Sequence, residues 1–159
     1  MQFFFLLFFF LGYPLSGGAG QGAFLNPTPY NSAPEIVALA QATPTPQGFK
    51  LTLTVRLEPK FHLYSVKPQG KFGPKPTALV VQTSGLEPVG ALGESPPLLK
   101  VDSALGLSLW VHEKEFWVAQ EFKNPGKLKG PIRGYLFYQL CDNLVCLNPA
   151  QSSFELKIP

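Results

Sequence analysis

Two cysteines, Cys141 and Cys146, are the only cysteines in the chain, and four residues separate them. An apolar and aromatic run leads into the first cysteine, and Pro149 follows the second. Asp142 and Asn143 favour a turn, because both residue types tolerate turn and left-handed conformations. The spacing therefore predicts two short antiparallel segments with one cysteine on each side of a bend, close enough to form a disulfide.

The pair has three candidate roles on residue chemistry alone. As a structural staple, a disulfide that closes so short a loop gives roughly 2 kcal/mol, against about 5 kcal/mol for a loop of about 100 residues. As half of a four-ligand metal site it would need His62 and His112, but the spacing matches no compact metal motif. As a site of thiol–disulfide exchange, one cysteine would form a mixed disulfide and the other would resolve it.

The expected exposure and the spacing of the pair bear on this choice. A close pair at a turn is expected to be accessible and somewhat strained, and both properties favour exchange. The spacing is not the C-x-x-C of thioredoxins, and no helix N-terminus is predicted that would lower the pKa of a cysteine. The residues leave a structural and a redox role open, and a redox pair of this kind would be a passive relay rather than a strong oxidant.

The composition indicates one β-rich domain. Of the 159 residues, 45% are hydrophobic and 14% are charged, which is enough to bury a core. The 17 prolines and 15 glycines argue against long helices and for short strands with many turns. The net charge of +3 comes without a block of Lys or Arg, so neither nucleic acid nor an anionic membrane surface is expected as a partner.

The N-terminus has the layout of a secretory signal peptide. Nine consecutive apolar residues at 3–11 precede a Gly-Tyr-Pro break and a run of small residues at 16–20. The apolar run is shorter than the ~20 residues that a membrane span needs. No Lys or Arg precedes it, and an uncleaved N-terminal anchor is the alternative. We expect a signal peptide at 1–22, a Pro-rich linker at 23–34 and an exported domain at 35–159, in an oxidising compartment.

Alternating hydrophobicity predicts the strands of this domain. The clearest signal is at 49–57, where apolar residues alternate with Lys, Thr and Arg over nine positions. Residues 43–46 are interpreted as linker or turn, and 84–97 as a loop with at most one short strand. Turn signals recur about every 8–12 residues, which is typical of an all-β sandwich of eight or nine short strands. Further strands are predicted at 35–41, 61–66, 77–83, 116–122, 132–140 and 153–158, with a weaker signal at 98–109.

Three segments match the sequence pattern of a known family. The strongest is Tyr138-Gln-Leu-Cys-Asp-Asn-Leu-Val-Cys-Leu-Asn-Pro149, similar to the family's Tyr-Gln-x-Cys, acidic or amide residues, Cys and Pro. The second is Phe61-His-Leu-Tyr-Ser65, and the third is the closing strand at 154–158. On these segments, residues 35–158 resemble the N-terminal periplasmic domain of the thiol:disulfide interchange protein DsbD.

The resemblance implies an immunoglobulin-like β-sandwich with a redox cysteine pair on a hairpin. In that family the domain accepts electrons from a thioredoxin-like domain and passes them to periplasmic partners, such as disulfide isomerases and the thioredoxins of cytochrome c maturation. The resemblance implies that Cys146 makes the mixed disulfides and that Cys141 resolves them. The family's positions that match His62 and Tyr64 lie beside the pair.

Two features depart from the family. Its best-known members shield the disulfide with a loop that carries acidic residues and an aromatic cap. The corresponding stretch at 101–109 has Asp102 but no aromatic residue, and Leu105 or Leu107 is the nearest substitute. We also expect that neither the membrane electron carrier nor the C-terminal thioredoxin domain of the family follows this domain. We therefore expect a thioredoxin-like or membrane thiol reductant to be supplied by a separate protein.

Single residues outside the cysteine bend have plainer interpretations. Taken alone, His62 is expected on a strand facing solvent, although the resemblance places it near the thiols, where a protonated imidazole would favour the thiolate. His112 is expected at the surface. Trp110 and Trp117 are expected in the core.

The leading hypothesis is an exported thiol–disulfide oxidoreductase of the protein-disulfide reductase type. It would be monomeric and relay electrons to periplasmic disulfide-bearing clients through a reversible Cys141–Cys146 disulfide. Asp142 would raise the pKa of the neighbouring Cys141 thiol and leave Cys146 as the better thiolate. No cofactor and no metal is expected, because the pair is itself the redox centre. The alternative is a non-enzymatic immunoglobulin-like binding module with a structural disulfide.

Overall fold

The computed structural model describes the domain from residue 36 onward. The expected signal peptide and linker lie outside the described residues. All regular structure in the described part is β-strand, which confirms the all-β prediction. No helix there is long and apolar enough to cross a membrane. The described residues are 36–71, 73–123, 128 and 130–157.

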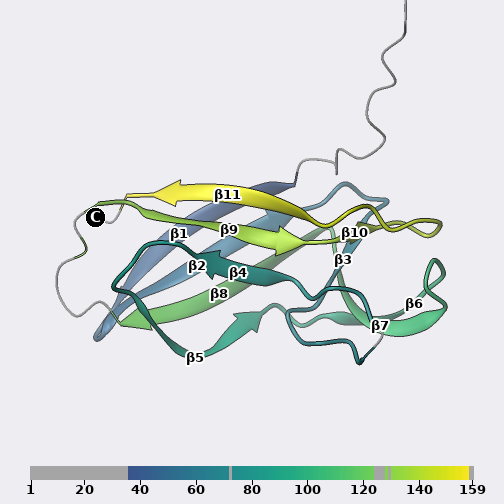
Figure 1. Cartoon of the computed structure of the whole chain (residues 1–159), viewed down its shortest axis with the longest axis horizontal. Coiled ribbons are helices and arrows are strands. Elements are labelled where there is room, and N and C mark those ends of the chain that lie inside the picture. Colours follow the sequence, from purple (N-terminus) through teal and green to yellow (C-terminus); the bar gives the residue numbers. More distant parts are fainter. Residues whose placement is uncertain (1–35, 72, 124–127, 129, 158–159) are drawn as a thin grey trace, which may run out of the picture. The chain divides into compact units, whose positions relative to one another are not determined.

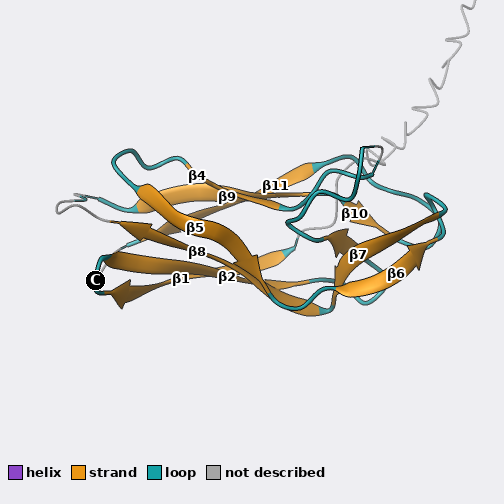
Figure 2. Cartoon of the chain, turned by 90° about the horizontal axis from the view of Figure 1, so that it is seen from below, coloured by secondary structure: helices purple, strands orange, loops and turns teal. Residues whose placement is uncertain are grey.

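The described strands form three antiparallel sheets (Figure 1). In Figure 2 the third sheet faces the first, and the second sheet lies beyond one end of both. The first sheet has the order β1 (Val37–Thr45), β2 (Gly48–Arg56), β8 (Glu115–Lys123), β5 (Glu87–Glu94). The second has the order β10 (Leu140–Cys141), β3 (His62–Tyr64), β7 (Leu107–Glu113), β6 (Leu98–Asp102). The third has the order β11 (Ala150–Leu156), β9 (Ile132–Tyr138), β4 (Ala78–Val81).

Strand β2 lies inside the first sheet and confirms the period-two prediction. Phe49, Leu51, Leu53 and Val55 are buried, while the residues between them are half-buried or exposed. Burying each such side chain stabilises the fold by roughly 1.5–3 kcal/mol. Buried residues of β8 and β9 complete this main core, which spans the first and third sheets. Strand β9 continues toward β10, so the core fixes the segment that carries the first cysteine.

Two predictions about the strands are wrong. Residues 43–45 belong to β1 rather than to a linker, and Pro44 is tolerated there because β1 is an edge strand, whose outer side needs no N–H donor. The segment predicted as mainly loop contains β5, an eight-residue strand. Its pairing with β8 shifts between Val89 and Gly93, and Gly90 has a φ of +70°. This irregularity removes the alternation that would reveal a strand in the sequence.

The expectation that both tryptophans lie in the core is also wrong. Trp110 is 47% exposed and Trp117 is 39% exposed. Trp110 lies between Leu109 and Val111, which are both buried, and Trp117 likewise alternates with buried residues of β8. Successive side chains of a strand point to opposite faces, so the buried neighbours force each indole outward.

Candidate functional site

The cysteine bend is a tight antiparallel turn closed by a disulfide. Cys141 ends β10 and pairs across the bend with Cys146, and the two Sγ atoms are bonded. The N–H of Asp142 donates to the carbonyl of Val145 at 3.0 Å, which closes the turn inside the pair. The structure thus confirms the predicted arrangement of two short segments with a cysteine on each side of a bend.

Asp142 forms the turn through its side chain. Its Oδ1 accepts the N–H groups of Leu144 at 2.8 Å and Val145 at 2.9 Å. These two amides lower the pKa of the Asp142 carboxyl. Leu144, at the tip of the bend, is 87% exposed. The carboxylate therefore faces the amides of its own turn, and its first role is structural.

The two sulfurs differ in their accessibility. Cys141 is fully buried and packs with Tyr64, Leu109 and Val111, whereas Cys146 is only partly buried. The expectation of an accessible pair is therefore wrong for Cys141. Cys141 is buried because β10 pairs with β3, which places Cys141 opposite His62 in the second sheet. A partner approaching from solvent would meet the sulfur of Cys146 first.

Tyr64 places a hydroxyl group against both sulfurs. Its oxygen lies 2.7 Å from Cys141 Sγ, 3.4 Å from Cys146 Sγ and 2.7 Å from Asp102 Oδ2. A phenol has a single proton, so it donates to only one of these acceptors at a time. Burial raises the pKa of Tyr64 strongly, and the hydrogen bond and charge of Asp102 raise it further. The phenol therefore stays protonated at neutral pH and remains a donor.

Asp102 is the acceptor at the centre of this cluster. It ends β6 and is buried, its Oδ2 faces His62 Nε2 at 2.9 Å as well as Tyr64, and its Oδ1 accepts the N–H of Leu105 at 3.0 Å. Burial raises the pKa of this carboxyl, but the hydrogen bonds from Tyr64, His62 and the Leu105 amide outweigh burial, so the pKa is lowered. Asp102 is therefore an ionised carboxylate beside the pair. The sequence identifies Asp102 only as the acidic residue of the stretch that corresponds to the family's cap, and not as a neighbour of His62 and Tyr64.

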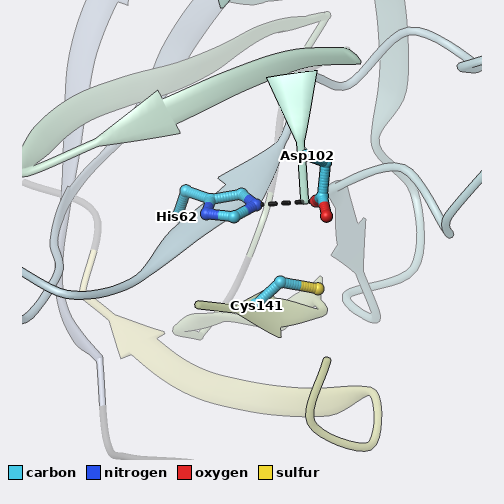
Figure 3. A group of neighbouring side chains, drawn as sticks. All are labelled: His62, Asp102 and Cys141. Carbon is cyan, nitrogen blue, oxygen red and sulfur yellow. Dashed lines mark hydrogen bonds and ion pairs between the residues drawn. The ribbon is translucent and has the colours of Figure 1, made fainter. Parts of the chain in front are cut away.

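His62 is buried, so the expectation that it faces solvent is wrong. It lies on β3, an interior strand whose three residues are all buried between β10 and β7. Figure 3 shows its ring directed at Asp102, with Cys141 beside both. Because the carboxylate is an acceptor, Nε2 carries a proton, while Nδ1 has no hydrogen-bond partner among the described residues. Ligand atoms of His62, Asp102 and Cys141 all lie within 4.8 Å of one another.

The other histidine is in a different place. His112 on β7 is buried, so its expected surface position is wrong. Its Nε2 lies 2.8 Å from Glu94 Oε2, and its ring stacks on Phe116 with 4.4 Å between ring centroids. The structure therefore does not bring His112 to the cysteines. The four-ligand set of two cysteines and two histidines is not assembled.

The stretch in the place of the family's cap forms the hairpin between β6 and β7. Leu105 and Leu107 are each 41% exposed. Leu105 contacts Asp102 through its backbone N–H. What the hairpin supplies to the site is thus a buried carboxylate.

Comparisons with known proteins agree with this geometry. A model of the family described as "Thiol:disulfide interchange protein DsbD, N-terminal" matches residues 33–158. The crystal structure of the Neisseria meningitidis DsbD N-terminal domain in the reduced form is similar, with 20% identity and a TM-score of 0.50 over 75% of this chain and 83% of that one. The N-terminal periplasmic domain of ScsB from Proteus mirabilis is similar with 21% identity and a TM-score of 0.59, over 78% of this chain and 47% of that one.

No curated protein matches the chain. The two structural neighbours confirm the predicted immunoglobulin-like fold. The family match covers most of the chain, including β3 and the cysteine bend, and confirms the resemblance found in those segments. The chain belongs to the family of DsbD N-terminal domains.

Proposed function

We propose that this domain relays electrons by thiol–disulfide exchange through a reversible Cys141–Cys146 disulfide. The observation that carries the proposal is the difference between the two sulfurs. Cys146 is partly accessible, and Cys141 is buried with the Tyr64 hydroxyl 2.7 Å from its sulfur. Exchange needs one sulfur that a partner can reach and one leaving group that the protein stabilises.

In the reductive half, a thiolate of the electron donor attacks Cys146 Sγ. A donor–Cys146 disulfide forms, the Cys141–Cys146 bond breaks, and the electron pair of that bond goes to Cys141 Sγ. The leaving thiolate accepts a hydrogen bond from the Tyr64 hydroxyl. A second thiolate of the donor then attacks the donor sulfur of the mixed disulfide. This step forms the donor's internal disulfide and releases the Cys146 thiolate. The donor is oxidised by two electrons and the pair is reduced by two.

In the oxidative half, the Cys146 thiolate attacks a client disulfide and forms a mixed disulfide, with one client sulfur leaving as a thiolate. Cys141, deprotonated, attacks Cys146 Sγ, which re-forms the internal disulfide and releases the second client thiolate. The client gains two electrons. As Cys141 loses its proton, Tyr64 is placed to accept that proton while it passes its own to Asp102, because the three groups form a hydrogen-bonded row.

The setting of the relay is proposed from the relatives. The Proteus mirabilis neighbour is described as a periplasmic domain, which supports a periplasmic location for this chain. The signal peptide predicted from the sequence would direct the chain there. The donor would be a thioredoxin-like or membrane thiol protein, and the clients periplasmic disulfide-bearing proteins, including those of cytochrome c maturation. In this relay the domain acts as a monomer and an oxidoreductase.

The reduction potential of the pair tests the proposal. The protein is equilibrated with glutathione buffers, the thiols are alkylated, and the reduced fraction is read by mass spectrometry. A relay is expected to have a potential of roughly −180 to −270 mV. A potential below about −300 mV would favour a binding module with a structural disulfide.

Trapping tests the order of the two cysteines. Cys141→Ala leaves Cys146 without a resolving partner, so it is expected to accumulate mixed disulfides with donor or client. Cys146→Ala is the matched control, because its remaining thiol is buried. Equal trapping by the two variants would contradict the assigned roles.

A further inference from the structure

We propose that the reduced domain binds one Zn²⁺ ion through Cys141, Cys146, His62 and Asp102, and that this ion holds the pair in its dithiolate state. The inference rests on the proposed function only in requiring that the disulfide can be opened. The site would compete with exchange, because a sulfur bound to the metal is not free to attack a client.

The closed site already gathers three of the four donors. Ligand atoms of His62, Asp102 and Cys141 lie within 4.8 Å of one another, and the sulfur of Cys146 is bonded to that of Cys141. Zinc bonds are about 2.0–2.3 Å long, so the donors of a tetrahedral site are roughly 3–4 Å apart. Opening the disulfide moves the two sulfurs apart toward that spacing, and His62 and Asp102 would close on them from within 4.8 Å of the Cys141 sulfur.

The donor types are those that zinc takes. Two thiolates, one imidazole nitrogen and one carboxylate oxygen form a mixed set of the borderline-soft kind. Cys141, His62 and Asp102 come from three strands of the second sheet, β10, β3 and β6, whose order in the sheet is β10-β3-β7-β6. The donors are therefore placed by the fold and need not be collected from a mobile loop.

Charge gives the reduced site a reason to take a cation. The Asp102 carboxyl and Cys141 are both buried. Opening the disulfide adds thiolate charge next to that carboxylate, and two anions close together in a dry site repel strongly. A divalent cation bound to both would neutralise them, as metal ions do for coordinated thiols.

Tyr64 limits the affinity of this site. Its hydroxyl hydrogen-bonds Asp102 and lies against both sulfurs, so it occupies space between the donors. Zinc binding would displace this hydroxyl from at least one of its acceptors. Removing the hydroxyl should therefore raise the affinity for zinc, whereas removing a ligand should lower it.

The binding step moves protons and no electrons. One Zn²⁺ replaces the protons of the two thiols, and up to two H⁺ are released. His62 would bind through Nε2 in the tautomer that carries its proton on Nδ1, so the ring releases no proton. When the disulfide re-forms, the cysteine pair passes two electrons to a client and the zinc ion returns to solution. Disulfide sulfurs are not thiolates, so the oxidised protein should not bind zinc at this site.

A metal titration tests the proposal. The protein is reduced, freed of reductant without oxygen, and titrated with Zn²⁺ against a chromophoric chelator. Co²⁺ is added separately to read thiolate-to-metal charge-transfer absorption. One ion per reduced chain with that absorption, and none in the oxidised protein, is the expected result. Equal binding by the two redox forms would overturn the site.

Variants separate this site from a simple dithiol. His62→Ala and Asp102→Asn should each weaken Zn²⁺ binding at least about tenfold, whereas His112→Ala, at the other buried histidine, should not. Tyr64→Phe should bind as tightly as the natural protein or more tightly. Unchanged binding in both ligand variants would overturn the proposal. A protein that exchanges disulfides but binds no zinc refutes this inference alone, and one that binds zinc but exchanges nothing refutes the relay alone.

Discussion

Two buried histidine–carboxylate pairs contact the same short segment of chain, residues 62–66, and they do different things there. Asp102 pairs with His62 at 2.9 Å, and Glu94 pairs with His112 at 2.8 Å. All four side chains are at most 6% exposed. In each pair, burial raises the pKa of the carboxyl but hydrogen bonds outweigh it, so both carboxyl groups have a lowered pKa.

The difference lies in what else each carboxylate binds. Glu94 accepts the Ser65 hydroxyl at 2.6 Å and the Val66 N–H at 2.9 Å, so it ties the exit of β3 to the end of β5 in another sheet. Asp102 accepts the Tyr64 hydroxyl, which also touches the sulfur of Cys141. A histidine paired with a buried carboxylate thus anchors two sheets in one place and lies beside the thiol chemistry in the other.

The largest effect is expected from removing the anchor. Glu94→Ala leaves Ser65, His112 and the Val66 amide without their acceptor in a buried place. We expect a loss of about 3 kcal/mol in the free energy of unfolding, since each unsatisfied buried group costs about 1–3 kcal/mol. Denaturant unfolding measures the loss. The reduction potential of the folded fraction should hardly change, and a large shift in potential would break the distinction between the two pairs.

Tyr64→Phe tests the other region and keeps both carboxylates, although Asp102 loses the hydrogen bond from the hydroxyl. The variant removes the hydrogen bond to the Cys141 thiolate, and a hydrogen bond to a charged group is worth about 1.5–3 kcal/mol. The pKa of the Cys141 thiol should therefore rise by about one to two units. Thiolate absorbance against pH in the reduced protein gives this value. A Phe residue keeps the packing, so unfolding should change much less than in Glu94→Ala.

Asp102→Asn should move the same thiol in the opposite direction. The carboxylate disfavours a thiolate nearby and competes for the Tyr64 proton, so its neutral replacement should lower the pKa of the Cys141 thiol by about one unit. A more stable thiolate makes the reduced form more stable, and the reduction potential should become less negative. The matched variant Glu94→Gln should leave both quantities in place. Equal shifts in the two variants would mean that the fold, rather than Asp102, sets the chemistry.

Acid should weaken both pairs together. A carboxyl whose pKa is lowered in the folded state stabilises the fold fully above its ordinary pKa, which is 3.8 for Asp102 and 4.5 for Glu94. That stability is lost as the pH falls through the lowered folded value. The free energy of unfolding should therefore fall between about pH 5 and pH 2. Glu94→Gln and Asp102→Asn should each flatten that slope, and a slope unchanged in both would contradict the assigned ionisation.

The sequence pattern of neighbouring residues was enough to predict single strands and the cysteine bend. The alternation of Phe49, Leu51, Leu53 and Val55 specifies a half-buried strand by itself, because the face of each side chain follows from its position. The turn chemistry between the two cysteines specifies the bend in the same way. These predictions needed no knowledge of which strands become neighbours.

The buried polar cluster could not be predicted in this way, because it is made by pairing between distant strands. Asp102 meets Tyr64 from 38 positions away, through the β6–β7 hairpin. His112 meets Glu94 at the end of β5, a strand whose sequence alternation is interrupted at Gly90. A histidine on a short strand looks solvated until its neighbours are known. Only the family pattern indicated that His62 and Tyr64 lie near the thiols.

The smallest effect is expected at Asp142, which the sequence suggested as the residue that tunes Cys141. Its Oδ1 is bound by the amides of Leu144 and Val145, and the side chain lies at the solvent-facing bend. Asp142→Asn keeps an oxygen acceptor for those amides, and solvent screens the lost charge. The thiol pKa should therefore shift much less than in Asp102→Asn, by the same absorbance titration. A pKa shift as large as that of Asp102→Asn would mean that Asp142 also sets the pKa of the Cys141 thiol. Asp102 would then have mainly a structural role, like that of Glu94.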